Sequence, residues 1–216
     1  MFIFIIWLTI SLALVVPLRW IDPVTSAFML LDDSGREPPL YEWADWQDIG
    51  IAPALAVVAA EDQRFADHFG FDFKSMQDAV RDSERGERLR GASTITQQLA
   101  KNLYLWSGRS YVRKGLEAWF TVLLEACLPK KRILEIYLNV VELGPGVYGI
   151  PVASRLYFGR DPSRIGDGQA ALLAAVLPNP HTLQADRPSD YVRERQRWIV
   201  GQMQRLRREQ WILNLD

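Results

Sequence analysis

Two glutamates in this chain have neighbours that predict different ionisation behaviour, and the first is Glu61. It follows the apolar and small residues 53–60. A carboxylate held against such neighbours is hard to ionise, so its pKa should rise toward the range useful for proton transfer. On a continuous helix Phe65 and His68 would share its face, four and seven residues later. Taken alone, an ordinary carboxylate at a helix end beside a core phenylalanine is the simpler interpretation.

The second glutamate, Glu117, has cations as neighbours. Helical spacing places it four residues after Arg113 and three after Lys114, so its carboxylate can meet both. Nearby positive charge should keep it ionised. Two carboxylates in opposed environments are typical of an acid–base pair. For this triplet alone, a surface ion pair worth about 0–1 kcal/mol is the alternative.

A polar helix face is predicted between the two glutamates. At about 100° per residue, one arc of this helix carries hydroxyl, amide and ammonium groups, and its members are Thr94, Gln97, Gln98 and Lys101. Such donors suit phosphate or sugar oxygens. Ser93 and Thr94 follow a glycine at the helix start, where free backbone N–H groups would add an anion site. A solvated face is the alternative, but such faces usually carry acids and this one carries none.

Composition limits the classes of function. The formal net charge of −1 gives no global case for binding nucleic acid. Residues 101–132 nevertheless hold seven bases and two acids, which fits an anionic substrate or lipid headgroups. One cysteine, Cys127, and two histidines argue against a cysteine zinc cage or a multi-histidine site, so no metal site is predicted.

These residues require a mainly α-helical scaffold with one sizeable core, which 216 residues at 49% hydrophobic content can bury. Strand patterns are scarce, and glycines and a proline predict a turn-rich break at 144–149. The polar residues 81–90 predict a mobile surface loop. Helices are expected over 53–70, 94–105, 110–128, 130–139, 167–177 and 189–210.

The N-terminus predicts a membrane anchor. Residues 1–18 carry no charged side chain, and a helix of about 20 such residues crosses a bilayer. Trp20 suits the interface that follows. A cleaved signal peptide is the alternative, but a basic start and a small-x-small cleavage site are missing. The chain is therefore divided into an anchor (1–19), a connector (20–50) and one further domain (51–216).

Together these segments resemble the peptidoglycan glycosyltransferases, glycosyltransferase family 51, from about residue 50 to 205. The family's motifs are matched in order by Glu61-Asp62-x-x-Phe65-x-x-His68-x-Gly70, by Gly91-Ala92-Ser93-Thr94-Ile95-Thr96-Gln97-Gln98-Leu99-x-Lys101-Asn102, by Arg113-Lys114-x-x-Glu117 and by Lys131-Arg132-Ile133-Leu134-Glu135-x-Tyr137-Leu138-Asn139. Two positions depart from the pattern. Ala92 replaces a second glycine, and Gln169 stands where a glutamate is common.

The resemblance implies a lysozyme-like fold of two lobes with a cleft between them. It implies that lipid II is polymerised into β-1,4-linked glycan with inversion and release of undecaprenyl pyrophosphate. Glu61 would be the general base, while Glu117, Lys101 and Arg113 would stabilise the pyrophosphate. The implied catalytic residues are Glu61 and Glu117, and the implied substrate-binding residues are Asp62, Phe65, His68, Ser93, Thr94, Gln97, Gln98, Lys101, Asn102, Arg113 and Lys114.

The resemblance also implies partners and a location. The partners would be lipid II, the growing glycan strand, membrane lipid and other cell-wall synthesis proteins, with no nucleic acid. The chain would cross the bacterial inner membrane once and carry its catalytic domain on the periplasmic side. No cofactor is required, although some family members use a divalent cation, so stimulation by Mg²⁺ or Mn²⁺ stays open.

Three rival classes remain for comparison. A bifunctional penicillin-binding protein would add a transpeptidase domain, but Ser-x-x-Lys and Lys-Thr-Gly motifs are missing, so no transpeptidase activity is expected. A lytic glycosidase would also use carboxylates, yet it needs no Gln-Gln-x-x-Lys-Asn face. A non-catalytic membrane scaffold would bind partners through the basic last helix, with Arg193, Arg195, Arg197, Arg205, Arg207 and Arg208.

Overall fold

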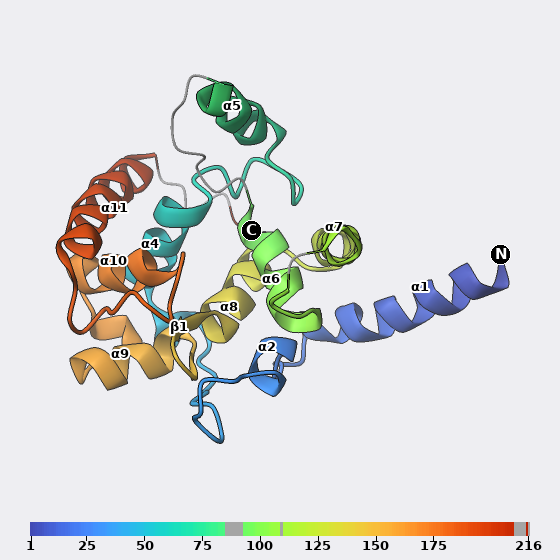
Figure 1. Ribbon diagram of the computed structural model, residues 1–216, viewed down its shortest axis with the longest axis horizontal. Helices are drawn as coiled ribbons and strands as arrows, with labels where there is room; N and C mark the ends of the chain where they lie inside the picture. The colour runs from blue at the N-terminus through green and yellow to red at the C-terminus, as the bar shows by residue number, and fades with distance from the viewer. Residues whose placement is uncertain (85–92, 109, 210–214, 216) are drawn as a thin grey trace.

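A computed structural model describes residues 1–84, 93–108, 110–209 and 215 (Figure 1). The fold is mainly helical, as predicted. The longer helices are α1 (Phe2–Val15), α4 (Ile51–Glu61), α5 (Phe73–Glu84), α6 (Ile95–Tyr104), α7 (Tyr111–Cys127), α8 (Lys130–Val140), α9 (Ile150–Phe158), α10 (Asp167–Val176) and α11 (Asp190–Arg208). The short elements are η1 (Val16–Arg19), α2 (Ala27–Leu30), α3 (Trp46–Ile49), η2 (Pro162–Arg164) and the antiparallel pair β1 (Glu142–Gly144) and β2 (Val147–Tyr148).

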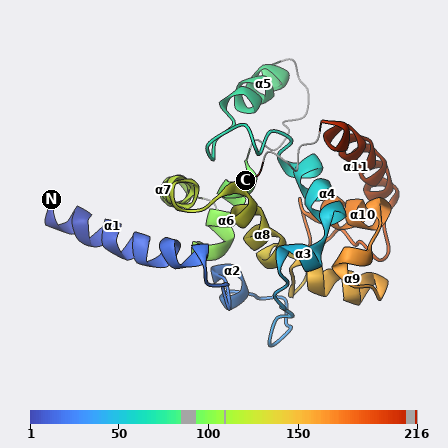
Figure 2. The same ribbon diagram turned by 180° about the vertical axis from the view of Figure 1, so that it is seen from behind.

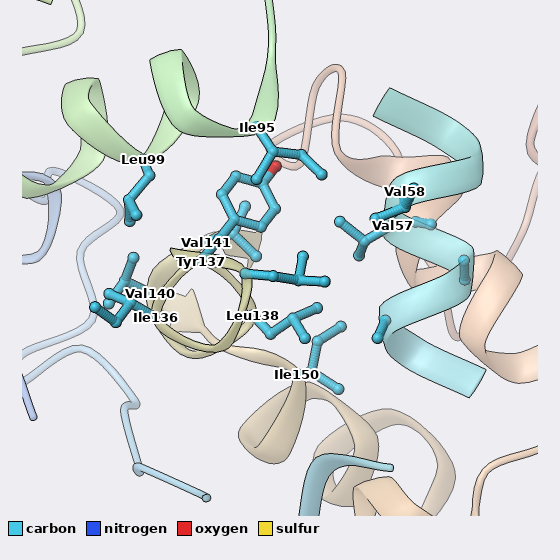
Figure 3. Close-up of a cluster of buried hydrophobic side chains, with 14 of the residues drawn as sticks. Val57, Val58, Ile95, Leu99, Ile136, Tyr137, Leu138, Val140, Val141 and Ile150 are labelled. Carbon is cyan, nitrogen blue, oxygen red and sulfur yellow. The ribbon is translucent and has the colours of Figure 1, made fainter. Parts of the chain in front are cut away.

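Helix α8 forms the centre of the core. Ile136, Tyr137 and Leu138 are completely buried, although they point in different directions around the helix. Figure 3 shows Tyr137 beneath Ile95 of α6, with side chains of α4 and α9 on the other sides of α8. Burial on so many sides explains why residues 133–140 are apolar apart from Glu135 and Asn139.

The remaining helices form two groups that share α8. On one side α4 packs against α10 and α11, and lies between α8 and that pair (Figure 2). The alanines and valines of α4 and α10 are almost all buried, because small side chains allow helix axes to approach closely. On the other side α6 packs against α7 and α8. These two groups are the two lobes of the expected fold.

The structure corrects three expectations about local structure. Helix α4 ends at Glu61 and does not continue to Gly70, so Glu61, Phe65 and His68 do not share a helix face. Asp62 leaves helical geometry (φ −159°, ψ 74°) because its carboxylate is bonded elsewhere, as described below. Helix α5 continues through residues 81–84, where a loop was predicted, and residues 85–90 of that loop lie outside the described part.

The third correction is helix α9, which follows the glycine-rich break and was not predicted. Its N-cap, Gly149, has φ +83°, and a Cβ there would lie 2.4 Å from the backbone oxygen of Asn139. Only glycine tolerates both this dihedral and this approach. Pro151 occupies the first turn of α9, where a proline has no helical hydrogen bond to lose. The residues that predicted a break therefore begin a helix.

The connector is bonded to the core. Asn139 of α8 accepts a hydrogen bond from the Ala44 backbone nitrogen at 2.9 Å and donates one to the Ala44 oxygen at 2.9 Å. Glu135 accepts from the Trp46 backbone nitrogen at 2.7 Å. Two backbone bonds join Leu40 to the β1–β2 hairpin, one to Gly146 in the turn and one to Tyr148 of β2. Where the connector ends and the next domain begins stays a prediction.

Helix α1 projects from the body of the molecule, with the N-terminus at its far end (Figure 1). Residues 2–19 form the one helical stretch in the described residues that is long and apolar enough to cross a membrane. It contacts α7, where the Trp119 indole donates to the Ser11 hydroxyl at 3.0 Å. Trp7 also packs against Trp119 and Phe120. The predicted anchor is therefore a helix with a specific contact on the rest of the chain.

Candidate active site

Glu61 ends α4 with its carboxylate largely enclosed, 14% exposed. One oxygen, Oε2, accepts a hydrogen bond from Gln98 Nε2 at 2.8 Å, and the other, Oε1, accepts from Arg195 Nη2 at 3.2 Å. Burial raises the pKa of Glu61, while the Gln98 bond and the Arg195 charge act in the opposite direction. The carboxylate is therefore held in one orientation and inclined to take up a proton, which suits a general base.

The orientation of Gln98 is set by Tyr137. The tyrosine hydroxyl donates to Gln98 Oε1 at 2.7 Å, which turns the amide nitrogen toward Glu61. Burial and the charge of Glu61 raise the pKa of Tyr137 well above its usual range, so this hydroxyl stays a donor. A buried chain of hydrogen bonds thus runs from α8 through α6 to the glutamate.

Asp62 and His68 attach the segment after Glu61 to the start of α6. Asp62 Oδ1 lies 2.9 Å from His68 Nε2, and Asp62 Oδ2 accepts from the Ile95 backbone nitrogen at 3.0 Å. A carboxylate at a helix start satisfies an amide that has no partner within the helix. Both side chains are almost fully buried. The structure gives them a role in positioning Glu61, and their predicted contact with substrate stays a prediction.

The predicted donor face of α6 is divided in the structure. Thr94 and Gln97 form a capping box, in which each side chain accepts a hydrogen bond from the other residue's backbone nitrogen. Thr94 also donates to the Gly70 oxygen at 2.7 Å. Both side chains are buried, so this half of the face is used in folding. Gln98 and Lys101 form the half that is directed at charged groups.

Three further predicted residues lie in contrasting places. Phe65 is fully buried, with Lys130 Nζ 4.4 Å from its ring centroid. Asn102 is buried on α6, whereas Ser93 is exposed just before the helix. Their contact with substrate stays a prediction. The departure at Ala92 lies outside the described residues.

Glu117 is enclosed by its two predicted partners. Arg113 Nη1 lies 3.1 Å from Glu117 Oε2, and Lys114 donates to Oε1. The glutamate is 4% exposed and Arg113 is 13% exposed, so this is a buried pair and the surface interpretation is wrong. Breaking a buried pair costs far more than breaking a surface one. The Arg113 Nε atom is buried and has no hydrogen-bond partner among the described residues.

Lys101 connects the two glutamates electrostatically. Burial lowers the pKa of Lys101, and the charges of Glu117 and Glu61 both act to raise it. Its ammonium group lies 5.1 Å from the Phe28 ring centroid. Because Lys101 responds to both carboxylates, Glu61, Lys101 and the Glu117 group form one charged site. Its cations can stabilise an anionic group close to a base.

The basic last helix supplies a residue that sequence reasoning missed. Arg195 was assigned to a solvated face or to partner binding, yet it pairs with Glu61. The signal was its position three residues after Val192 and four before Ile199, both of which are fully buried. An arginine on the buried face of an amphipathic helix needs an acceptor inside the fold.

Two surface hollows lie away from this site, against the connector and α9. One is lined by Glu42, Asp48, Arg155 and Asp161, and the other by Leu40, Tyr41, Val152 and Leu156. Arg155 pairs with Glu42 and Asp161, so the charges in the first hollow largely satisfy one another. Within the described part of the chain, no three His, Cys, Asp or Glu side chains are placed to hold a metal ion together. The cofactor expectation stays a prediction.

Comparison with known proteins connects the chain to an activity. The sequence pattern of the Transglycosylase family matches residues 33–204. A biosynthetic peptidoglycan transglycosylase of Pseudomonas entomophila is 49% identical over 212 residues, which cover 95% of this chain and 90% of that protein. Proteins of the same name from Pseudomonas aeruginosa and Stutzerimonas stutzeri are 45% and 49% identical, covering 100% and 94% of this chain and 96% and 86% of their own lengths. The chain therefore belongs to the peptidoglycan transglycosylase family, the glycosyltransferases of cell-wall biosynthesis.

Proposed function

We propose that the chain polymerises lipid II into β-1,4-linked glycan strands, with inversion and release of undecaprenyl pyrophosphate, and has no transpeptidase activity. The observation that carries this proposal is the pair of contrasting glutamates around Lys101. Glu61 is enclosed, held by one amide and one guanidinium, and has a raised pKa. Glu117 is surrounded by cations. A base beside a cationic cluster is what attack by a hydroxyl and departure of a pyrophosphate require.

Glu61 is the general base in this proposal. Its carboxylate takes the proton of the acceptor sugar's 4-hydroxyl as that oxygen forms a bond to the donor's anomeric carbon. The bond from that carbon to the lipid pyrophosphate breaks on the opposite face, and the pyrophosphate leaves with the bonding electrons. Gln98 keeps the carboxylate in place through the proton transfer.

The cations around Glu117 stabilise the departing pyrophosphate. Lys101 and Arg113 supply positive charge in a half-buried site, where charge interactions are stronger than in water. Glu117 holds Arg113 and Lys114 in place and prevents them from repelling each other.

The predicted substrate-binding residues fall into two groups in this proposal, those that contact substrate and those that support them. Gln98, Lys101, Arg113 and Lys114 act at the charged site, and Ser93 binds at its edge. The buried side chains support them from beneath, and these are Asp62, Phe65, His68, Thr94, Gln97 and Asn102. Replacing a supporting residue should therefore lower stability as well as rate.

We assign the protein to the bacterial inner membrane, crossed once by residues 1–19, with the catalytic domain on the periplasmic side. An apolar helix that a connector joins to the domain supports this, because substrate and leaving group are both lipids in this proposal. Lipid II, the growing strand and membrane lipid are the proposed partners, together with other cell-wall synthesis proteins and without nucleic acid. No cofactor is required in this proposal, and a divalent cation such as Mg²⁺ or Mn²⁺ can stimulate the reaction.

The test is polymerisation of labelled lipid II in detergent, followed as lysozyme-digestible product. Glu61→Gln should reduce the rate by about 10³-fold, as expected for loss of a general base. Glu117→Gln should reduce it by about 10²-fold, as expected for loss of charge stabilisation. Glu194→Gln, an exposed change on α11, is the matched control and should behave like wild type.

Three outcomes would contradict the proposal. Wild type that leaves lipid II untouched, with and without Mg²⁺ or Mn²⁺, favours the scaffold alternative. Wild type that shortens preformed glycan favours the lytic glycosidase. Full activity in folded Glu61→Gln removes the base assignment while leaving the polymerase in place.

A further inference from the structure

Helix α11, near the C-terminus, carries Arg195, whose guanidinium group is hydrogen-bonded to Glu61. Arg195 lies 134 positions after Glu61, and its Nη2 donates to Glu61 Oε1 at 3.2 Å. The arginine side chain is 23% exposed. Val192, Ile199 and Met203 on the same face of α11 are completely buried. Arg195 is therefore the cationic member of a buried helix face, whereas Arg193 and Arg197 are exposed.

Three contacts fix the position of α11 relative to α10 and to the end of α4. Gln196 Nε2 donates to the Gly168 oxygen at 2.7 Å. Arg207 forms two bonds with the Asp167 carboxylate, both at 3.0 Å. Arg205 donates to Gln63, two residues after Glu61. All three contacts lie C-terminal to Arg195 along the helix, and the fully buried Val192 precedes it, so the guanidinium is placed by the fold.

Glu61 faces several other charged or polar groups. Asp62, the next residue, opposes its ionisation, whereas Lys101 of α6 is close enough to favour it. Gln98 of α6 donates to Oε2, and Tyr137 of α8 lies behind Gln98 as a neutral hydroxyl. Among the described residues, Arg195 is the one cation that is hydrogen-bonded to the Glu61 carboxylate.

We propose that Arg195 is a positioning residue for the base, which orients the Glu61 carboxylate through Oε1 and keeps it ionised in a buried site. This inference rests on the proposed function, in which Glu61 takes a proton. Burial alone favours the protonated form, and a protonated carboxyl cannot act as a base. With Oε1 fixed by Arg195 and Oε2 by Gln98, the remaining lone pairs of the carboxylate point in set directions.

The test is the pH profile of lipid II polymerisation for Arg195→Gln beside wild type. Removing the cation should raise the pKa of Glu61 further, so the acidic limb of the profile should move to higher pH. On that limb the variant should be at least about tenfold slower than wild type, while the two rates converge toward alkaline pH. Arg195→Lys keeps the charge and should recover most of the shift. Arg193→Gln, on the exposed side of the same helix, is the control and should leave the limb unmoved.

Different results separate this inference from the proposed function. An active wild type whose acidic limb is unchanged in Arg195→Gln overturns the role of Arg195. An equal loss at every pH, not recovered by Arg195→Lys, also overturns it, because that pattern is purely structural. An inactive wild type would instead overturn the proposed function. The Glu61 titration followed by carboxyl ¹³C NMR then decides about Arg195, because it requires no turnover and should move upward in Arg195→Gln.

Discussion

The surroundings of Glu61 and Glu117 are built in opposite ways. Glu117 has its partners on its own helix, three and four residues away. Glu61 has its partners on other helices, 37 positions away at Gln98 and 134 positions away at Arg195. One environment forms with a single helix, and the other requires the whole fold. The comparison separates a charge cluster that local sequence specifies from a base that only tertiary structure can place.

The largest expected effect tests the local cluster. Glu117→Ala should lower the free energy of unfolding by about 3 kcal/mol, because it leaves the buried Arg113 guanidinium without its carboxylate. Denaturant unfolding in detergent measures this. The double change Glu117→Ala with Arg113→Ala should recover part of the loss. If it recovers none, the pair is not the source of the cost.

A smaller effect is expected from the tertiary network around Glu61. Tyr137→Phe removes the donor to Gln98 Oε1 and should cost about 1–3 kcal/mol, because a buried acceptor is left unpaired. The Gln98 amide can then turn away from Glu61, so the polymerisation rate should also fall, by about tenfold. Tyr191→Phe, at a half-exposed position on α11, is the control for losing a phenol. A normal rate in Tyr137→Phe would show that Gln98 holds its orientation without help.

The two glutamates should also differ in the sign of their effect on stability. Because burial raises the folded-state pKa of Glu61, the folded protein binds a proton there more tightly than the unfolded chain does. The free energy of unfolding therefore falls as pH rises from the ordinary glutamate pKa of 4.5 to the higher pKa that Glu61 has in the folded protein. Glu61→Gln should therefore melt at a higher temperature than wild type at neutral pH, and the difference should vanish in acid. Melting curves at several pH values measure this, with Glu194→Gln as control. A destabilised Glu61→Gln at neutral pH would mean that Arg195 and Gln98 outweigh burial.

The smallest effect belongs to the outer edge of the local cluster. Lys114 is 49% exposed, and Arg113 remains on Glu117 without it. Lys114→Gln should therefore change the free energy of unfolding by less than about 1 kcal/mol. A change as large as that of Glu117→Ala would make the lysine an equal partner in the buried pair.

This difference also explains what could be predicted from the sequence. The triplet of Arg113, Lys114 and Glu117 was predicted with its partners, because helical spacing alone brings them together. The main helices were predicted to within one or two residues at most ends. The end of α4 was not, because Asp62 leaves the helix to bond the start of α6, 33 positions later. The stretch of sequence around Glu61 does not include the partner that ends the helix, so the end could not be predicted from it.

Thr94 and Gln97 illustrate a second limit. Their types and spacing fit two different roles, a donor face for a ligand and a capping box for the helix. The structure shows the cap. Sequence spacing gave the correct arc, but it could not tell which polar groups the backbone would use. For Arg195, the amphipathic pattern of its helix predicts a place on the buried face, but it does not predict that Glu61 is the partner.

The contact between Ser11 and Trp119 has a consequence for how α1 can enter a membrane. α7 is seen end-on where α1 is seen from the side, so the two helices cross steeply (Figure 1). Ser11 lies at the middle of the apolar run 2–19, so with α1 upright in a bilayer the indole bond would hold Trp119 at the depth of the acyl chains. Glu117 precedes Trp119 by two residues and would be held at a similar depth, where charged groups are costly. Helix α1 must therefore separate from α7 when the whole of residues 2–19 enters a bilayer.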